Sequence, residues 1–257
     1  MKLEKDERIE DLELNNLKII QNKSLYCFTS DSAILANFVG AKKTDTCLEI
    51  GCGSGVISIL VNEKCQPKKI YAFEAQKEMF ELASKNIKLN NLEEKIEVIN
   101  EKVQNFEKHF KSGFFDVVFT NPPYLKTTNK NLLNENSVIA NCRHDTLLPL
   151  CELASTSSKL LKFGGKFFIV YRPDRLSECL CELSKNKLEP KKLFFVSSKE
   201  NSSPILFLLE AVKGAKHGMK ILPTLITNDK DGNYIYTIQK LYREGLWFIL
   251  FQLQLEI

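Results

Sequence analysis

Short apolar runs alternate with amphipathic stretches through most of the chain after residue 45. Apolar runs of about four to eight residues bounded by turn residues predict buried strands, and longer stretches with a helical period predict helices. The predicted strands are 46–50, 69–73, 96–99, 115–120, 166–171, 193–196 and 205–211. One predicted helix begins near 57. Three others cover 77–90, a part of 145–162, and 176–184. This alternation predicts an α/β fold with a mostly parallel sheet and an antiparallel strand at one edge.

Both ends of the chain lie outside this alternation. In the N-terminal segment 1–44, the runs 17–20 and 25–28 predict two short strands, and Thr29-Ser30-Asp31 then predicts a helix N-cap. The tail 243–257 is apolar and contains the single tryptophan, and we expect it to form an edge strand or a docked segment. Residues 45–242 between them are predicted to form the main domain.

Glycines occupy alternate positions after the first strand of the main domain. Without Cβ atoms, Gly51, Gly53 and Gly55 can adopt positive φ angles and let a ligand approach the backbone. A dinucleotide site would place its third glycine where Val56 stands, which disfavours a dehydrogenase. Glu74 ends the next predicted strand, where a carboxylate can accept both hydroxyl hydrogens of a ribose. The order of these features predicts a nucleoside cofactor.

Asn121-Pro122-Pro123-Tyr124 directly follows the apolar run 115–120. The amino nitrogen of adenine or of a glutamine amide is a poor nucleophile because its lone pair is delocalised. The Asn121 side-chain oxygen and the Pro122 carbonyl can accept its two hydrogens and stabilise positive charge that develops on it. The two prolines restrict the backbone, and Tyr124 can stack on a planar base. This motif predicts methylation of such an amino group without a metal.

Glu49, two positions before Gly51, completes an acid-and-glycine pattern that resembles motif I of class I methyltransferases. Together with Asn-Pro-Pro-Tyr, it makes the chain resemble the bacterial tRNA1(Val) adenine-N6 methyltransferase family over about residues 17–241. Further matching pieces are 29–32, 73–76, 143–145, 171–176, 213–214, 218 and 222–223. The resemblance implies a Rossmann-like class I methyltransferase that uses S-adenosyl-L-methionine. It also implies an adenine of RNA as substrate, in tRNA near the anticodon.

The resemblance assigns roles to individual residues. Thr29 and Asp31 would close over the methionine part of the cofactor, and Glu49 would order that part or the glycine loop. Relatives carry an aspartate for the cofactor's adenine where this chain has Lys102, so we expect Glu101 or a backbone carbonyl to replace it. The residues implied to face RNA, in addition to Pro123, are Arg172, Arg175, Lys213, Lys216 and Lys220.

Composition is compatible with this interpretation. A hydrophobic content of 44% and a charged content of 26% are ordinary for a soluble globular protein. The net charge of +4 permits nucleic-acid binding without indicating it. No run approaches the roughly 20 apolar residues that cross a membrane. The eight cysteines form no CxxC pair, so we expect free thiols in a cytoplasmic protein without a metal site.

Three other functions remain open at this point. A glutamine N5-methyltransferase acting on a translation release factor shares Asn-Pro-Pro-Tyr, but such enzymes usually carry a helical N-terminal domain, and only about 44 residues precede the core here. A DNA adenine methyltransferase would be expected to carry a target-recognition domain. A non-catalytic RNA-binding protein that kept the fold would need neither Glu74 nor Asn121.

Overall fold

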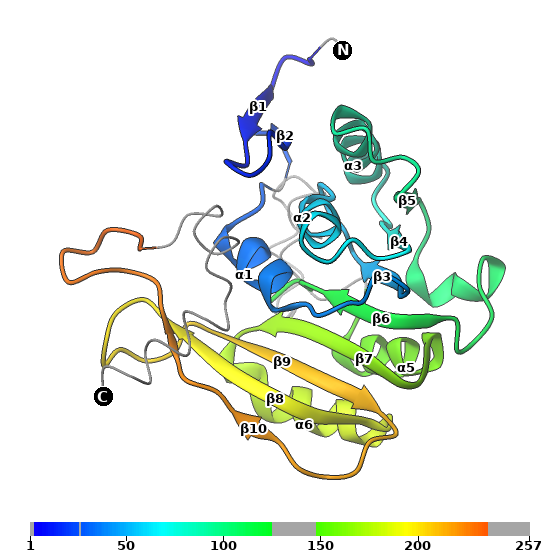
Figure 1. Cartoon of the computed structure of the whole chain (residues 1–257), viewed down its shortest axis with the longest axis vertical. Coiled ribbons are helices and arrows are strands. Elements are labelled where there is room, and N and C mark those ends of the chain that lie inside the picture. Colours follow the sequence, from blue (N-terminus) through cyan, green and yellow to red (C-terminus); the bar gives the residue numbers. More distant parts are fainter. Residues whose placement is uncertain (1–2, 26, 125–147, 236–257) are drawn as a thin grey trace, which may run out of the picture.

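The computed structural model describes residues 3–25, 27–124 and 148–235 (Figure 1). Its centre is a nine-stranded sheet with the order β10-β8-β9-β7-β6-β3-β4-β5, in which β11 also pairs with β8. The strands are β3 (Thr46–Ile50), β4 (Lys69–Phe73), β5 (Ile96–Ile99), β6 (Phe115–Thr120), β7 (Leu161–Tyr171), β8 (Leu188–Ser197), β9 (Leu206–Lys213), β10 (Lys220–Ile221) and β11 (Leu225–Ile226).

The sheet is mostly parallel, as the sequence predicts. β7, β6, β3, β4 and β5 are all parallel, whereas β9 is antiparallel to both of its neighbours, β7 and β8. The antiparallel strand therefore lies inside this side of the sheet, and β8 with the short β10 and β11 lies beyond it. Because the parallel strands share one direction, their carboxyl ends meet at one edge of the sheet.

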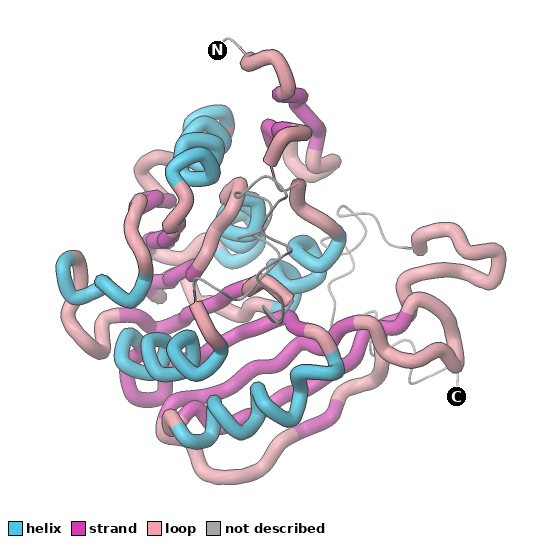
Figure 2. Tube along the Cα trace, turned by 180° about the vertical axis from the view of Figure 1, so that it is seen from behind, coloured by secondary structure: helices cyan, strands magenta, loops and turns pink. Residues whose placement is uncertain are grey.

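Helices cover both faces of the sheet (Figures 1 and 2). One face carries α1 (Ser30–Phe38), α2 (Val56–Cys65) and α3 (Lys77–Leu89), and the other carries η1 (Val103–Lys108), α5 (Leu150–Leu160), η3 (Pro173–Arg175) and α6 (Leu176–Lys185). Side chains alternate between the two faces of a strand. On β7, Phe168 and Val170 therefore join the core beneath α1 and α2, whereas Phe167 and Ile169 join the core beneath α5 and α6.

A separate hairpin of β1 (Glu7–Asp11) and β2 (Lys18–Asn22) lies beside α3. The Asn86 side chain of α3 joins the two, because its oxygen accepts from Ile20 N at 2.6 Å and its nitrogen donates to Ile20 O at 3.1 Å. The strand predicted over 17–20 is thus part of β2, but the described residues of 25–28 form no strand. The partner of β2 is instead the charged stretch Glu7–Asp11.

The boundary between the helix predicted within 145–162 and the strand predicted over 166–171 differs from the prediction. α5 ends at Leu160 and β7 begins at Leu161, so Gly164 and Gly165 lie inside the strand. Gly164 has a φ of +76°, and the pairing of β6 with β7 shifts register next to this stretch, so the glycines form an irregular start to the strand.

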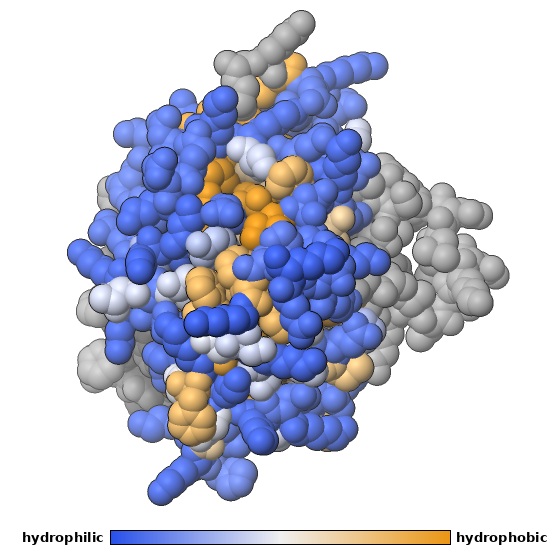
Figure 3. Space-filling view, turned by 90° about the vertical axis from the view of Figure 1, so that its right-hand side faces the viewer, coloured by the Kyte–Doolittle hydropathy of each residue, from blue (hydrophilic) through white to orange (hydrophobic). Residues whose placement is uncertain are grey.

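Figure 3 shows the face at the right of Figure 1, where polar side chains surround a limited apolar strip.

Candidate active site

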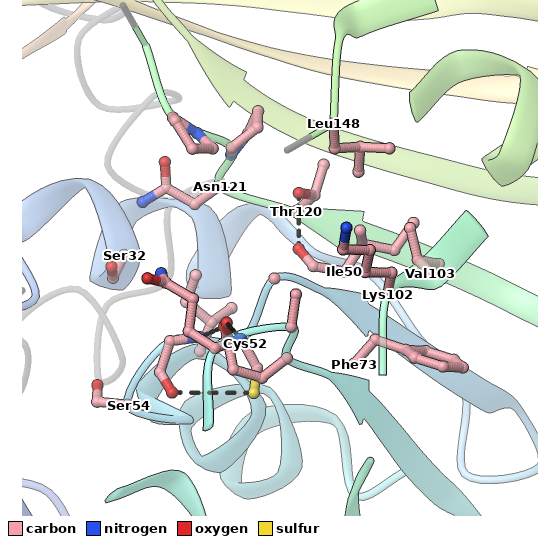
Figure 4. A pocket seen from close by; sticks show the side chains of 18 of the residues that line it. Ser32, Ile50, Cys52, Ser54, Phe73, Lys102, Val103, Thr120, Asn121 and Leu148 are labelled. Carbon is pink, nitrogen blue, oxygen red and sulfur yellow. Dashed lines mark hydrogen bonds between the residues drawn. The ribbon is translucent and has the colours of Figure 1, made fainter. Parts of the chain in front are cut away.

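A pocket opens at the carboxyl ends of β3, β4, β5 and β6 (Figure 4). The residues that follow these four strands line it, among them Gly51, Glu74, Glu101 and Asn121. Sequence motifs that are separated by as many as 70 positions therefore contribute to one cavity. This edge is where α/β folds of this kind bind their ligands.

The glycine loop has the conformation that its sequence predicts. Gly51, Gly53 and Gly55 have φ angles of +69°, +55° and +80°, which other residues rarely adopt. The amides of Gly51 and Cys52 both donate to the Phe73 carbonyl, at 2.9 and 3.1 Å, so the end of β4 holds the loop in place. Gly51 and Gly53 thus line the pocket without side chains, whereas Gly55 lies against Ala83 of α3 and does not line it.

Glu74 is 6% exposed and its carboxylate already accepts hydrogens from the backbone. Gly53 N lies 2.9 Å from Oε2 and Gln76 N lies 2.9 Å from Oε1. Burial raises the pKa of Glu74, and hydrogen bonds from the backbone amides of Gln76, Gly53 and Ala75 oppose this shift. A carboxylate offers about four acceptor positions, so Glu74 can support the loop and still accept hydroxyl groups in the pocket.

Glu49 lies beneath the loop and does not line the pocket. Its side chain is fully buried on β3, and Oε2 accepts a hydrogen from the Ser58 hydroxyl of α2. Its Oε1 has no hydrogen-bond partner among the described residues. Burial raises the pKa of Glu49 to about 8, with a smaller contribution from the charge of Glu74. The Ser58 contact joins β3 to α2, and the expected role of Glu49 in ordering the loop or the methionine part of the cofactor stays a prediction.

Glu101 and Lys102 both line the pocket after β5. The Glu101 carboxylate accepts from the Lys102 amide at 2.9 Å, the Asn105 side chain at 2.8 Å and the Lys108 ammonium at 2.8 Å. These hydrogen bonds, led by the one from Lys108, lower the pKa of Glu101 to about 2. Figure 4 shows the Lys102 side chain beside Ile50 and Val103, so this part of the pocket holds a cation as well as a carboxylate.

Asn121, Pro122 and Pro123 line the pocket at the end of β6. The preceding residue fixes their position, because the Thr120 hydroxyl donates to the Ile50 carbonyl of β3 at 2.8 Å. The Tyr124 hydroxyl lies 2.7 Å from Asn121 Oδ1 and 2.9 Å from Asp31 Oδ2. The motif predicted to carry the chemistry thus meets the start of α1.

The segment before α1 contributes differently from the expectation. Thr29 is the N-cap residue of α1, but its side chain makes no capping hydrogen bond. Asp31 lies in the first turn and contacts Tyr124, whereas Phe28 and Ser32 are the residues of this segment that line the pocket. Neither was singled out from the sequence, because nothing in the local pattern shows which side of a nine-residue helix faces a cavity.

Arg175 does not face solvent, and its predicted role as an RNA contact is wrong. It is 4% exposed, and its guanidinium binds Glu178 through two hydrogen bonds of 2.9 and 3.0 Å. The same group lies 5.2 Å from the centre of the Tyr171 ring, a cation–π distance. Tyr171 in turn packs edge to face against Tyr124, with ring centres 5.9 Å apart. Arg175 therefore belongs to the packing behind the motif.

Three predicted RNA contacts lie away from the pocket. Lys213 ends β9, which runs antiparallel to β7, so roughly 23 Å of strand separates it from the end nearest the pocket. Its ammonium donates to the carbonyls of Ser158 and Leu161 at the end of α5. Lys216 follows in the next loop, and Lys220 lies midway along the sheet on β10. These three lysines therefore do not flank the pocket, and their contact with RNA stays a prediction.

Arg172 keeps a position consistent with its prediction. It directly follows β7 at the edge of the sheet where the pocket opens, and its exposed side chain donates to Asp174 at 3.3 Å.

The stretch 143–145 and the tail 243–257 lie outside the described residues. Within the ranges that the structure describes, no helix is long and apolar enough to cross a membrane, and no group of three or more His, Cys, Asp or Glu could hold a metal.

Comparisons with known proteins identify a family and several similar proteins. The family model described as "Methyltransferase small domain" matches residues 17–185. The tRNA1(Val) (adenine(37)-N6)-methyltransferase of Dyadobacter fermentans is 26% identical over 79% of this chain and 82% of its own length. The protein with the same name from Shewanella woodyi is 25% identical over 80% of this chain and 86% of its own length.

Solved structures resemble the fold. A predicted O-methyltransferase from Agrobacterium tumefaciens superimposes with a TM-score of 0.66 and 18% identity, covering 84% of this chain and 96% of that chain. The tRNA m1G37 methyltransferase of M. jannaschii superimposes with a TM-score of 0.57 and 17% identity, covering 84% of this chain and 59% of that chain. At these identities the likeness concerns the fold alone, and it matches the Rossmann-like architecture expected from the sequence.

Proposed function

Because the chain belongs to the methyltransferase small domain family, we propose that it methylates N6 of an adenine in tRNA, near the anticodon, with S-adenosyl-L-methionine as methyl donor. The observation that carries the proposal is the shared pocket of Asn121, Pro122 and Pro123 with the glycine loop and Glu74. The names of the Dyadobacter and Shewanella relatives support the choice of nucleobase and of RNA.

The pocket fits S-adenosyl-L-methionine in its donor and acceptor groups. Glu74 supplies a buried carboxylate for a ribose diol, and the positive φ angles of Gly51 and Gly53 leave the loop backbone open to a ligand. Glu101 and Lys102 are available for the purine, and Ser32 for the amino-acid end. When bound, this cofactor supplies an electrophilic methyl group on a sulfonium.

The chain's own residues then align and stabilise the target amine. Asn121 and the Pro122 carbonyl accept its two hydrogens, so the nitrogen lone pair is directed at the methyl carbon. This nitrogen would take the methyl group from the sulfur of the bound cofactor, and one amino hydrogen would leave as a proton to solvent. The positive charge that appears on nitrogen meets two oxygen dipoles, which lowers the barrier, and alignment contributes at most roughly 7–11 kcal/mol. The Tyr124 ring holds the base by stacking.

A tRNA substrate also sets where the protein acts. We propose a cytoplasmic protein that binds RNA phosphates at the rim of the pocket, with Arg172 as the best-placed described contact. Phosphate contacts supply affinity and position, whereas the pocket at Asn121 selects the base. An adenine in a loop is accessible to such a pocket because it can unstack.

Transfer of labelled methyl groups from S-adenosyl-L-methionine tests the proposal. Separate pools of unmodified tRNA, rRNA, DNA and protein are incubated with the enzyme, and the digested products are identified by mass spectrometry. We expect N6-methyladenosine in the tRNA pool. Label in N6-methyladenine of DNA, or in glutamine of a release factor without any labelled nucleoside, would contradict the proposal and support the corresponding alternative.

A further inference from the structure

The Tyr124 hydroxyl lies between two oxygen atoms that can only accept hydrogen bonds. Asp31 Oδ2 is 2.9 Å away and Asn121 Oδ1 is 2.7 Å away. A phenol carries one hydrogen, and neither an ionised carboxylate nor an amide oxygen can provide a second one. In this arrangement, the Tyr124 hydrogen can serve only one of the two oxygens. The other short contact brings two oxygen atoms together with no hydrogen between them, which is repulsive.

A half-turn of the Asn121 amide removes this conflict. It exchanges the amide oxygen and nitrogen, which have nearly the same shape, so that orientation is decided by the hydrogen-bond partners. The nitrogen can then donate to the Tyr124 oxygen while the Tyr124 hydrogen goes to Asp31. Every group in this chain of three residues then has a partner of the right kind.

The same half-turn changes what the pocket receives. In Figure 4 the amide nitrogen of Asn121 lies on the side of Ser32, which lines the pocket, and the oxygen points the other way. An amino substrate needs an acceptor there, because its own hydrogens are donors. After the half-turn, the amide oxygen takes the place of the nitrogen on this side of the pocket, where it can accept a hydrogen from an amino group.

We therefore infer that Asp31 is a positioning residue, which acts through the Tyr124 hydroxyl to turn the Asn121 amide so that its oxygen faces the pocket. The inference rests on the proposed function, since it assigns the orientation of the group that binds the amine. Asp31 acts from the start of α1, on an element separated from the motif by 93 positions in sequence.

The surroundings of Tyr124 make this arrangement rigid enough to work. Its ring packs edge to face on Tyr171, which is 1% exposed and is covered by the guanidinium of Arg175. Arg175 is held by the partly exposed Glu178, so the ring is supported from behind by a buried guanidinium. The hydroxyl therefore keeps its place between Asp31 and Asn121, and the amide is the part that rotates.

A double-mutant cycle on turnover tests the inference. Tyr124→Phe keeps the ring but removes the hydroxyl, and Asp31→Ala removes the acceptor that directs it. We expect each variant to lower kcat about tenfold, the worth of one hydrogen bond of about 1.4 kcal/mol. We expect the double variant to be no slower than either single one, because both changes release the same amide. Affinity for S-adenosyl-L-homocysteine should stay within about twofold.

Three outcomes overturn the inference. Losses that multiply to about a hundredfold would mean that the two residues act independently. A wild-type kcat in Tyr124→Phe would remove the hydroxyl from any role. A large loss of S-adenosyl-L-homocysteine affinity in Asp31→Ala would make Asp31 a cofactor contact. Glu78→Ala, which removes the exposed first-turn acid of α3, controls for loss of helix-dipole stabilisation and should keep wild-type kcat.

A second measurement does not depend on activity. In the cofactor-free protein, hydrogen exchange of the Asn121 side-chain amide is followed by NMR. We expect faster exchange in Tyr124→Phe, because the amide nitrogen loses its acceptor, and an unchanged rate would contradict the inference. If the wild-type protein methylates no adenine at all, the proposed function fails, and this measurement still decides the orientation of the amide.

Discussion

Replacement of Glu49 by glutamine should change how folding stability depends on pH. Glu49 is fully buried on β3, and burial raises its pKa from an ordinary value of 4.5 to about 8. Between these two values the folded protein keeps a proton that the unfolded chain releases. The stabilisation from this group is therefore complete below about pH 4.5 and is lost as the pH rises towards 8.

The size of the effect follows from the shift. One pKa unit corresponds to about 1.4 kcal/mol, so the wild-type protein should lose on the order of 2–3 kcal/mol between pH 5.5 and 7.5 through Glu49. Glutamine cannot titrate, but its amide oxygen can still accept the hydrogen of the Ser58 hydroxyl. Glu49→Gln should thus equal or exceed wild-type stability at pH 7.5.

Urea unfolding of both proteins at the two pH values measures the difference. Glu74 also titrates with a raised pKa, but it is present in both proteins, so most of its contribution cancels in the comparison. Glu97→Gln removes a half-exposed acid on β5, which β4 separates from β3, and should retain the wild-type slope. Equal slopes for wild type and Glu49→Gln would refute the argument that Glu49 is protonated in the folded protein.

Other changes separate the cofactor site, the chemistry and the RNA surface. Glu74→Ala should weaken S-adenosyl-L-homocysteine binding by roughly 1.5–3 kcal/mol in calorimetry, and unchanged affinity would exclude Glu74 from the site. Asn121→Ala should keep this affinity and lower turnover at least about a hundredfold, so a wild-type rate would contradict the amino-group mechanism. Arg172→Ala should raise the KM for tRNA and reduce its salt slope by about 0.7–0.9. Lys213→Ala should instead lower only the unfolding temperature, because its ammonium binds the carbonyls at the end of α5. A changed KM for tRNA in Lys213→Ala together with an unchanged KM in Arg172→Ala would refute the placement of these two residues.

Local sequence signals were sufficient for the central part of the fold. The strands 46–50, 69–73, 96–99 and 115–120 match β3, β4, β5 and β6, because buried parallel strands appear as compact apolar runs. The pocket was predictable for the same reason, since its motifs directly follow those runs and parallel strands end at one edge. The hairpin strand Glu7–Asp11 was missed because four of its five residues are charged and it is stabilised by pairing with β2.

The errors on the RNA side have a different cause. A basic residue looks the same in sequence whether it faces solvent or forms a buried ion pair. Arg175 is buried because Glu178 lies three positions later on the same helical turn and Tyr171 lies beneath it. Lys213 points to the end of α5 because β9 is antiparallel, a property of strand pairing that the composition of 205–211 does not show. Position in the sheet, not charge, separates Arg172 from these two residues.

The order of the strands also limits what the pocket can hold. Glu101, Glu74, the glycine loop and Asn121 follow β5, β4, β3 and β6, which are neighbours in this order in the sheet, although β6 comes after β5 in the sequence. A ligand whose ribose binds Glu74 can reach Asn121 only by crossing the glycine loop, which explains why that loop needs an open backbone. In the proposed function, the purine would lie toward β5 and the reactive end toward β6, where Asp31 and Tyr124 meet Asn121. The sheet order thus arranges cofactor binding and amine activation along one edge, with the positioning residue on the helix that precedes the first of these strands.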